Sequence, residues 1–429
     1  MTKPTVVIAV CVLCASSCVG ARAPAPGRYL AAWSGDADRH QSDFLAIVDI
    51  DSSSPGYGTV VASVPAAAVS TEPHHMEYAY TPGRSLFASG WSGHRMFRFD
   101  VSHPLAPRLL GEVRAPPGFN YAHSFARLPD GDVLATMQGD DSSDDGPGGL
   151  VRFHDDGMVV ASASAAVPGV KGARLRPYSL IALPAENRVI SASATMDLEA
   201  WNPHAAAVEH AMMEGDIPNT AQLWELTPFR LLATVALDAP QVKSDSFPAC
   251  AKVMLTCPPG LLPMEPRLLA DGRTAMVSTE LCGLFRLSGL DSGTFRADYV
   301  YRFEGVGCSV PLRIGHYWLE AVIGTSRVVV LDIADPMHPV EVSRVQFAPD
   351  ENVHWISADA DGRRIAVTHV GTAEQRIWLL RFNPATGAIA MDSSFHDPGT
   401  RVPGVSFKRE HWPHGETGPA IPHGVVFLP

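Results

Sequence analysis

The chain repeats one pattern of short strands seven times, and this repeat limits the folds it can adopt. Each copy contains an apolar strand that often ends in an acidic or polar residue. The seven copies are Phe44–Asp49, Met96–Asp100, Leu150–His154, Gln222–Glu225, Leu284–Leu287, Val328–Asp332 and Ile377–Arg381. Most follow one another at a spacing of roughly 45 to 60 residues, which is typical of the blades of a β-propeller.

A second strand, rich in small and β-branched residues, precedes six of these copies and follows a turn signal such as Asp130-Gly131. The turn in turn follows a short strand, and another turn and strand come after the apolar strand. The four strands together form one antiparallel blade. The first blade lacks an inner strand on its N-terminal side, where its first strand starts abruptly at Arg28–Trp33, and a spare strand, His423–Leu428, remains at the C-terminus. The sequence therefore predicts an all-β, seven-bladed β-propeller over residues 27–429, closed by pairing the C-terminal strand into the first blade.

Three segments interrupt the repeat. Residues 197–220 include a helical-looking stretch, residues 238–263 hold a Pro-rich loop, and residues 393–422 form an irregular run of Gly, Pro and His. Long loops on a rigid ring usually cover the mouth at which ligands bind.

The charge balance excludes some classes of partner. A net charge of −12 argues against a nucleic-acid surface and against attraction to anionic lipid. The chain has 17 histidines beside only 33 lysines and arginines, which is a first indication of metal or acid–base chemistry.

The N-terminus has the pattern of an export signal. Lys3 precedes an apolar stretch too short for a membrane span, and small residues suit cleavage after Ala21. We expect residues 1–21 to be a signal peptide, no transmembrane segment in the mature chain, and a periplasmic or secreted location. The alternative is a lipoprotein anchored through Cys18.

Four cysteines follow the predicted signal: Cys250, Cys257, Cys282 and Cys308. An even number in an exported chain suits two disulfides, but four cysteines allow three pairings. Cys250 with Cys257 closes the smallest loop. Cys308 is either a ligand or tied to Cys282, and the sequence does not decide between these.

Histidines occupy one register of the predicted blades. His75, His123 and His354 each lie nine residues before the same position of a following turn, and His423 takes this place in the closing strand. Inner strands converge on the propeller axis, so these four residues should ring one mouth of the channel. The other three blades place Tyr178, Met264 and Cys308 in this slot.

Four converging imidazoles suit copper, iron, nickel or zinc better than calcium or magnesium. His75, His123, His354 and His423 are therefore the predicted metal ligands. His74 should point to the opposite face of its strand and act as a hydrogen-bonding neighbour. Glu77, two residues after His75, should face the ligands and orient an imidazole or move a proton.

At these residues the chain resembles the selenium-binding protein and methanethiol oxidase family. The resemblance lies in Phe44–Asp51, in the pair His74-His75, in His123 and His354, and in the closing Pro422–Phe427. It implies a seven-bladed propeller with a copper site held by His75, His123, His354 and His423. It also implies an oxidase that converts methanethiol and oxygen to formaldehyde, hydrogen sulfide and hydrogen peroxide. Family members carry a cysteine-containing segment soon after the paired histidines, whereas Met76–Tyr80 follows here.

The leading hypothesis is an exported copper oxidase of a small thiol, with oxygen as the second substrate and Glu77 or His74 handling protons. Two alternatives stay open: a non-enzymatic copper carrier or interaction propeller, and an iron-dependent oxygenase. The sequence gives no indication of oligomeric state.

Overall fold

The computed structural model describes residues 27–91, 95–140, 146–194, 217–240, 242–243, 256–291, 294–349, 351–369, 375–416 and 418–429. The predicted signal peptide, Cys18, Cys250 and most of the helical-looking insertion lie outside these residues. No helix among those described is long and apolar enough to cross a membrane.

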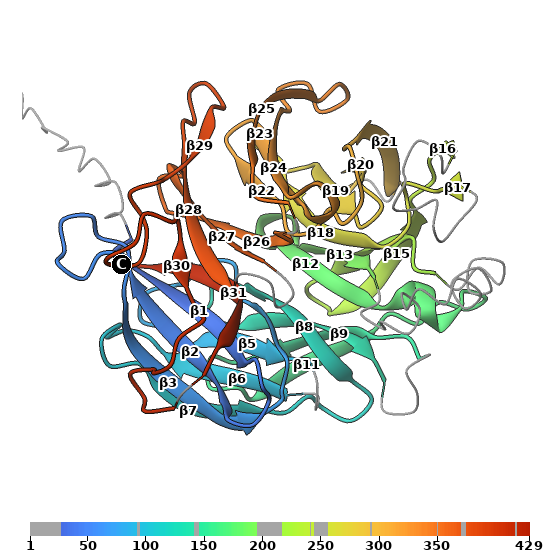
Figure 1. Ribbon diagram of the computed structural model, residues 1–429. Helices are drawn as coiled ribbons and strands as arrows, with labels where there is room; N and C mark the ends of the chain where they lie inside the picture. Colours follow the sequence, from blue (N-terminus) through green and yellow to red (C-terminus); the bar gives the residue numbers. More distant parts are fainter. Residues whose placement is uncertain are drawn as a thin grey trace, which may run out of the picture.

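Seven antiparallel sheets radiate around a common axis as the blades of a propeller (Figure 1). The first blade runs from the axis outward through β31 (Ala420–Leu428), β1 (Tyr29–Asp36), β2 (Ser42–Asp49) and β3 (Val60–Val69). The second contains β4 (Pro73–Met76), β5 (Leu86–Gly90), β6 (Arg95–Asp100) and β7 (Arg108–Val113). The third contains β8 (Asn120–Arg127), β9 (Val133–Gly139), β10 (Gly149–Phe153) and β11 (Val159–Ser164).

The remaining blades follow the same order from the axis outward. The fourth contains β12 (Pro177–Leu183), β13 (Arg188–Ser193), β14 (Thr220–Glu225) and β15 (Arg230–Ala236). The fifth contains β18 (Pro263–Leu268), β19 (Ala275–Thr279), β20 (Gly283–Ser288) and β21 (Arg296–Arg302). The sixth contains β22 (Leu312–Ile314), β23 (Tyr317–Val322), β24 (Arg327–Asp332) and β25 (Val340–Gln346). The seventh contains β26 (Val353–Ala358), β27 (Arg364–His369), β28 (Arg376–Phe382) and β29 (Ile389–Met391).

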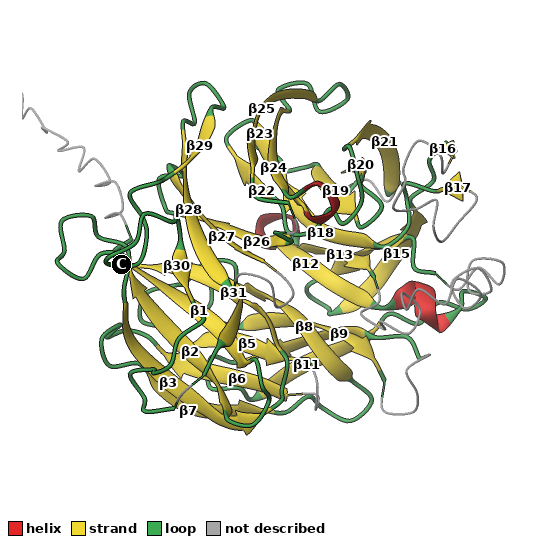
Figure 2. Ribbon diagram, viewed as in Figure 1, coloured by secondary structure: helices red, strands yellow, loops and turns green. Residues whose placement is uncertain are grey.

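Short elements connect or extend the blades, and strands dominate the fold (Figure 2). Three 3-10 turns are described: η1 (Gly172–Leu175), η2 (Pro184–Glu186) and η4 (Ile323–Thr325). The expected loop 238–263 holds a small pair, β16 (Val242–Lys243) with β17 (Thr256–Cys257). The irregular C-terminal run holds β30 (Val405–Ser406), which pairs with β28, and it gives way to β31 at Ala420.

The predicted architecture is confirmed in detail. All seven repeated strands are third strands of a blade, counted from the axis, and the C-terminal strand β31 pairs antiparallel with β1 along its length. Closure leaves the first blade with a paired inner edge, which protects it from pairing with another chain.

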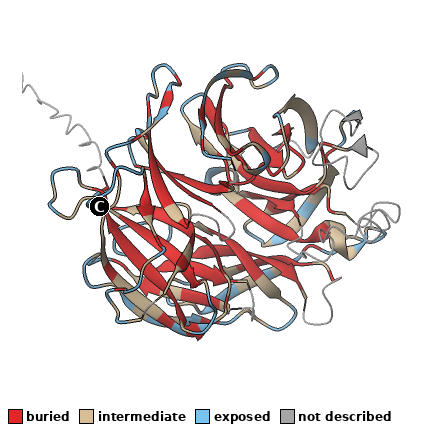
Figure 3. Cartoon of the chain, in the orientation of Figure 1, coloured by how far each residue is buried: buried red, intermediate tan, exposed pale blue. Residues whose placement is uncertain are grey.

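The core lies between the blades, where inner and middle strands are almost wholly buried (Figure 3). In the first blade, every residue of β2 is buried, whereas β3 at the rim mixes buried, half-buried and exposed residues. This gradient follows from the architecture, because middle strands have a neighbouring sheet on both faces and rim strands face water. Buried packing holds the inner strands rigidly, and these strands carry the candidate site.

Candidate metal centre

A β-bulge interrupts each inner strand that carries a ring histidine. The register shifts between Pro73 and Met76 in β4, between Ala122 and Phe125 in β8, and between Val353 and Ile356 in β26. In β31 the shift lies between Pro422 and Val425, opposite β1. A bulge bends the strand and re-aims the side chain at the extra residue. The repeated bulges therefore turn the histidines of the slot toward the axis.

The structure brings the four predicted ligands His75, His123, His354 and His423 into one cluster. The imidazole centroids of His75 and His123 are 3.9 Å apart, and those of His354 and His423 are 4.7 Å apart. His75 lies 5.6 Å from His423 and joins the two pairs. The structure thus brings together imidazoles from four neighbouring blades.

The orientation predicted for His74 is wrong. Its ring stacks on that of His75, with centroids 4.7 Å apart and planes 6° apart, and lies 4.2 Å from the ring of His423. Strict alternation along a strand would send the two side chains to opposite faces. The bulge in β4 breaks this alternation, so both imidazoles enter the cluster.

The cluster consists of two overlapping triads. Donor atoms of His74, His75 and His123 all lie within 4.8 Å of one another, and so do those of His75, His354 and His423. His75 belongs to both triads and is the centre of the arrangement. A metal ion near His75 can therefore draw donors from either side.

All five imidazoles are held neutral by their surroundings. His75 and His123 are fully buried, and the other three are 6% exposed. Burial, reinforced by the neighbouring imidazoles, lowers the pKa values of His74, His75, His123 and His423 well below the ordinary range. Burial and His369 lower the pKa of His354 to about 4. Neutral imidazole is the form that binds metal ions.

Hydrogen bonds assign the donor atom of His123. Its Nδ1 lies 2.8 Å from the carbonyl oxygen of Tyr178, which only accepts, so Nδ1 carries the proton. The Nε2 atom then presents a lone pair. Among the described residues, the Nε2 atoms of all five cluster histidines find no hydrogen-bond partner despite their burial. Buried nitrogen atoms are rarely left in this state without a function.

Hydroxyl groups fix the backbone on which the ligands are mounted. Ser89 donates to the carbonyl oxygens of both His75 and His123, at 3.2 Å each. Thr368 donates to the carbonyl of His423 at 2.5 Å, and Ser309 to that of His354 at 2.8 Å. Each carbonyl is tied to a residue of its own or a neighbouring blade, which limits movement of the imidazoles.

Glu77 does not occupy the place predicted for it. Arg127 donates to both of its carboxylate oxygens, at 2.9 and 2.6 Å, and the amide of Phe87 donates to Oε1 at 3.1 Å. Burial raises the pKa of Glu77, and the ion pair with Arg127 opposes this. Its carboxylate thus joins the second blade to the third and is engaged away from the imidazoles.

Three residues near the cluster were missed by sequence reasoning. The carboxylate of Glu265 in β18 approaches His75, with Oε1 3.4 Å from Nδ1. The hydroxyl of Tyr78 bonds to the same carboxylate, and His369 at the end of β27 acts electrostatically on His354 and His423. Glu265 directly follows Met264, the slot residue of the fifth blade, so alignment of the position after the slot would have found it.

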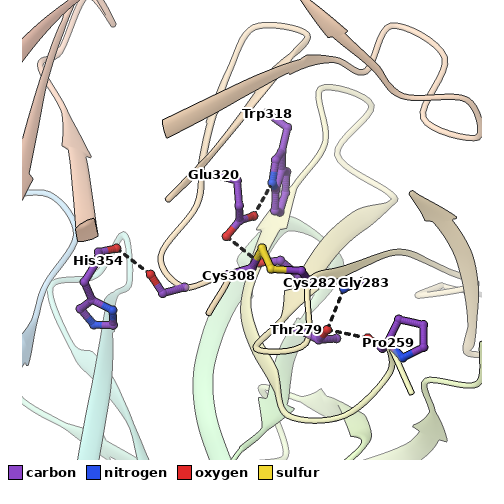
Figure 4. Close-up of a disulfide and its surroundings, with 10 residues drawn as sticks. Pro259, Thr279, Cys282, Gly283, Cys308, Trp318, Glu320 and His354 are labelled. Carbon is purple, nitrogen blue, oxygen red and sulfur yellow. Dashed lines mark hydrogen bonds between the residues drawn. A yellow bond between two sulfur atoms is a disulfide. The ribbon is translucent and has the colours of Figure 1, made fainter. Parts of the chain in front are cut away.

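The three slots without histidine are filled differently. The ring of Tyr178 packs on His123 with centroids 3.8 Å apart, and Met264 is buried beside Tyr178. Cys308 forms a disulfide with Cys282 (Figure 4), so the alternative in which Cys308 is a metal ligand is not adopted. The predicted pairing of Cys250 with Cys257 involves side chains outside the described residues.

Comparisons with known proteins support the fold. No family model matches the chain, and no curated protein matches it in sequence. A hypothetical selenium-binding protein from Sulfolobus tokodaii superposes with a TM-score of 0.69 at 14% identity, covering 94% of both chains. A periplasmic gluconolactonase from Pseudomonas aeruginosa gives 0.58 at 12% identity, covering 94% of this chain and 99% of its own. A putative 6-phosphogluconolactonase from Bacteroides fragilis gives 0.53 at 11% identity, covering 94% and 98%. At these identities the likeness shows a shared propeller fold.

Proposed function

We propose that the protein is a copper-dependent oxidase of a small thiol such as methanethiol. The observation that carries the proposal is the set of five buried, neutral imidazoles whose Nε2 atoms lack partners among the described residues. An all-imidazole donor set suits copper or iron and is poorly matched to calcium or magnesium. The selenium-binding protein of similar fold is consistent with sulfur-like substrates, because sulfur and selenium share their chemistry.

The ligand set would be His75, His123, His354 and His423, with His74 as a further donor. Copper held by these imidazoles would supply one-electron redox chemistry. The chain itself holds the imidazoles neutral and excludes bulk water from the donor atoms. It also keeps the proton of His123 on Nδ1, through the Tyr178 carbonyl, so that Nε2 stays free to bind.

The overall reaction would consume methanethiol, oxygen and water and release formaldehyde, hydrogen sulfide and hydrogen peroxide. Carbon is oxidised by two electrons, and oxygen accepts them to become peroxide. We propose a periplasmic or secreted location, supported by the Cys282–Cys308 disulfide, since disulfides persist mainly in oxidising compartments.

The test begins with elemental analysis of protein expressed with added copper, followed by oxygen uptake and peroxide release with methanethiol. His123→Ala is the informative variant, and His338→Ala, whose side chain is 82% exposed, is the matched control. We expect one or more copper ions per chain, turnover in the wild type and the control, and loss of turnover in His123→Ala. Protein without any bound transition metal would overturn the proposal.

Two other outcomes would redirect it. Copper bound without oxygen uptake across a panel of thiols would identify a metal carrier. Iron in place of copper, with oxygen consumption, would identify an iron-dependent oxygenase. Either result contradicts the copper oxidase and is distinguished by the same two measurements.

A further inference from the structure

The fifth blade contributes no histidine to the cluster, yet its inner strand delivers a carboxylate to it. Glu265 is fully buried in β18. Its Oε2 atom accepts hydrogen bonds from the hydroxyls of Tyr78 and Ser179 and from Nη1 of Arg267, the last at 3.2 Å. Its Oε1 atom has no hydrogen bond among the described residues and lies 3.4 Å from Nδ1 of His75.

The donors around Glu265 can be assigned one by one. The carboxylate only accepts, so Tyr78 and Ser179 donate to Oε2. The Ser124 oxygen accepts from the Tyr78 hydroxyl at 3.2 Å, and it lies against Nδ1 of both His75 and His123, at 2.9 and 3.0 Å.

This assignment links His75 to Glu265 twice. One link is the direct approach of Nδ1 to Oε1, and the other passes through the hydroxyls of Ser124 and Tyr78. The direct approach favours the proton of His75 on Nδ1, because a carboxylate oxygen repels a nitrogen lone pair and attracts an N–H group. The lone pair then stands on Nε2, the atom that has no partner in the cluster.

Packing keeps Tyr78 in place for this role. Its ring stacks on that of Trp355 at 5.0 Å and 9°, and the guanidinium carbon of Arg267 lies 4.4 Å from its centroid. Trp355 also packs edge-on against His75 at 4.9 Å. The hydroxyl is therefore fixed relative to both His75 and Glu265.

We propose that Glu265 is a positioning residue of the metal centre: it holds His75 as the Nδ1–H tautomer and strengthens its Nε2 as a donor. The proposal rests on the metal site proposed above. A carboxylate that accepts the second N–H of a metal-binding histidine orients the ring and raises its basicity. His75 is shared by both triads, so its tautomer affects the whole cluster.

The test compares Glu265→Gln with Glu320→Gln. Glu320 on β23 is another fully buried carboxylate, which accepts from Trp318 Nε1 at 2.7 Å and from Ser278 at 3.3 Å, and it makes a control matched in burial (Figure 4). Copper affinity is measured by competition with a chelator, and the copper hyperfine coupling by electron paramagnetic resonance. We expect Glu265→Gln to weaken binding by about 10- to 100-fold and to change the hyperfine coupling, with Glu320→Gln close to wild type.

A second readout needs no metal. Nitrogen-15 chemical shifts of the His75 ring in metal-free protein report its tautomer, which we expect to be Nδ1–H in the wild type and mixed in Glu265→Gln. If the wild type binds copper without turnover, while its copper affinity and the His75 tautomer depend on Glu265, the oxidase proposal fails and this inference stands. An unchanged tautomer, or an affinity equal to that of Glu320→Gln, would overturn the role of Glu265.

Tyr78→Phe serves as the second variant if Glu265→Gln folds poorly. It keeps the ring that stacks on Trp355 and removes the hydroxyl that completes the indirect link. We expect a smaller loss of copper affinity, of about two- to fivefold, which corresponds to one ordinary hydrogen bond. Wild-type affinity in Tyr78→Phe would show that the chain through Ser124 does not act on His75.

Discussion

The metal-free protein should lose stability on mild acidification, because the cluster holds its histidines neutral. His354 allows the size of the effect to be worked out, since its pKa falls from 6.5 to about 4 on burial beside His369. The unfolded chain takes up this proton near pH 6.5 and the folded chain does not. Above pH 6.5 the free energy of unfolding is therefore unaffected by this group. It falls as the pH drops from 6.5 towards 4, and near pH 4 it stops changing.

Between pH 7 and pH 5 this linkage amounts to about 2 kcal/mol of unfolding free energy for His354, at about 1.36 kcal/mol per tenfold change in proton binding. Urea unfolding of metal-free wild type and His354→Gln at both pH values measures it. We expect the wild type to lose about 2 kcal/mol more than the variant over this interval. The exposed His338→Gln serves as the control and should follow the wild type. Equal pH dependence in wild type and His354→Gln would refute the argument that burial keeps this imidazole neutral.

Further predictions concern groups outside the donor set. Replacing Cys282 and Cys308 by serine removes a disulfide that joins residues 26 positions apart in sequence. We expect urea unfolding to show that the free energy of unfolding falls by about 3.5 kcal/mol. An unchanged midpoint would show that the disulfide does not constrain the unfolded chain. Glu77→Gln should cost about 1.5 to 3 kcal/mol, because buried Arg127 keeps only Asp155 as a counter-charge. Elemental analysis should find wild-type metal content, and a lower metal content would place Glu77 in the site after all. Thr368→Val removes the hydroxyl that donates to the His423 carbonyl, and we expect the free energy of unfolding to fall by about 1 to 3 kcal/mol. Calorimetry measures this loss, and wild-type stability in the variant would contradict the prediction.

The parts of the fold that follow from local pattern were predictable. Turn signals and alternating apolar residues mark each strand, so the closing strand at His423 and the common register of the ring histidines follow from alignment alone. The same local rule failed for His74, because the β4 bulge adds a residue that no alternation pattern reveals. Bulges depend on how two strands pair, and pairing is a tertiary property.

The carboxylate partner was misassigned for a related reason. Glu77 is close to His75 in sequence, but its side chain meets Arg127 of the third blade. Glu265 is far from His75 in sequence and reaches it across the channel, between blades that are not neighbours in the ring. A contact of this kind depends on the diameter of the channel, which the order of residues along one strand does not contain.

Ring closure has a consequence for the order in which the site is made. His423 lies in β31, which pairs with β1 and is synthesised after the strands of every other blade. A nascent or truncated chain that stops before this strand lacks both the seal of the ring and one imidazole of the cluster. At the proposed metal site, the complete donor set would therefore form only after β31 has been made, and a fully loaded centre would report that the ring has closed.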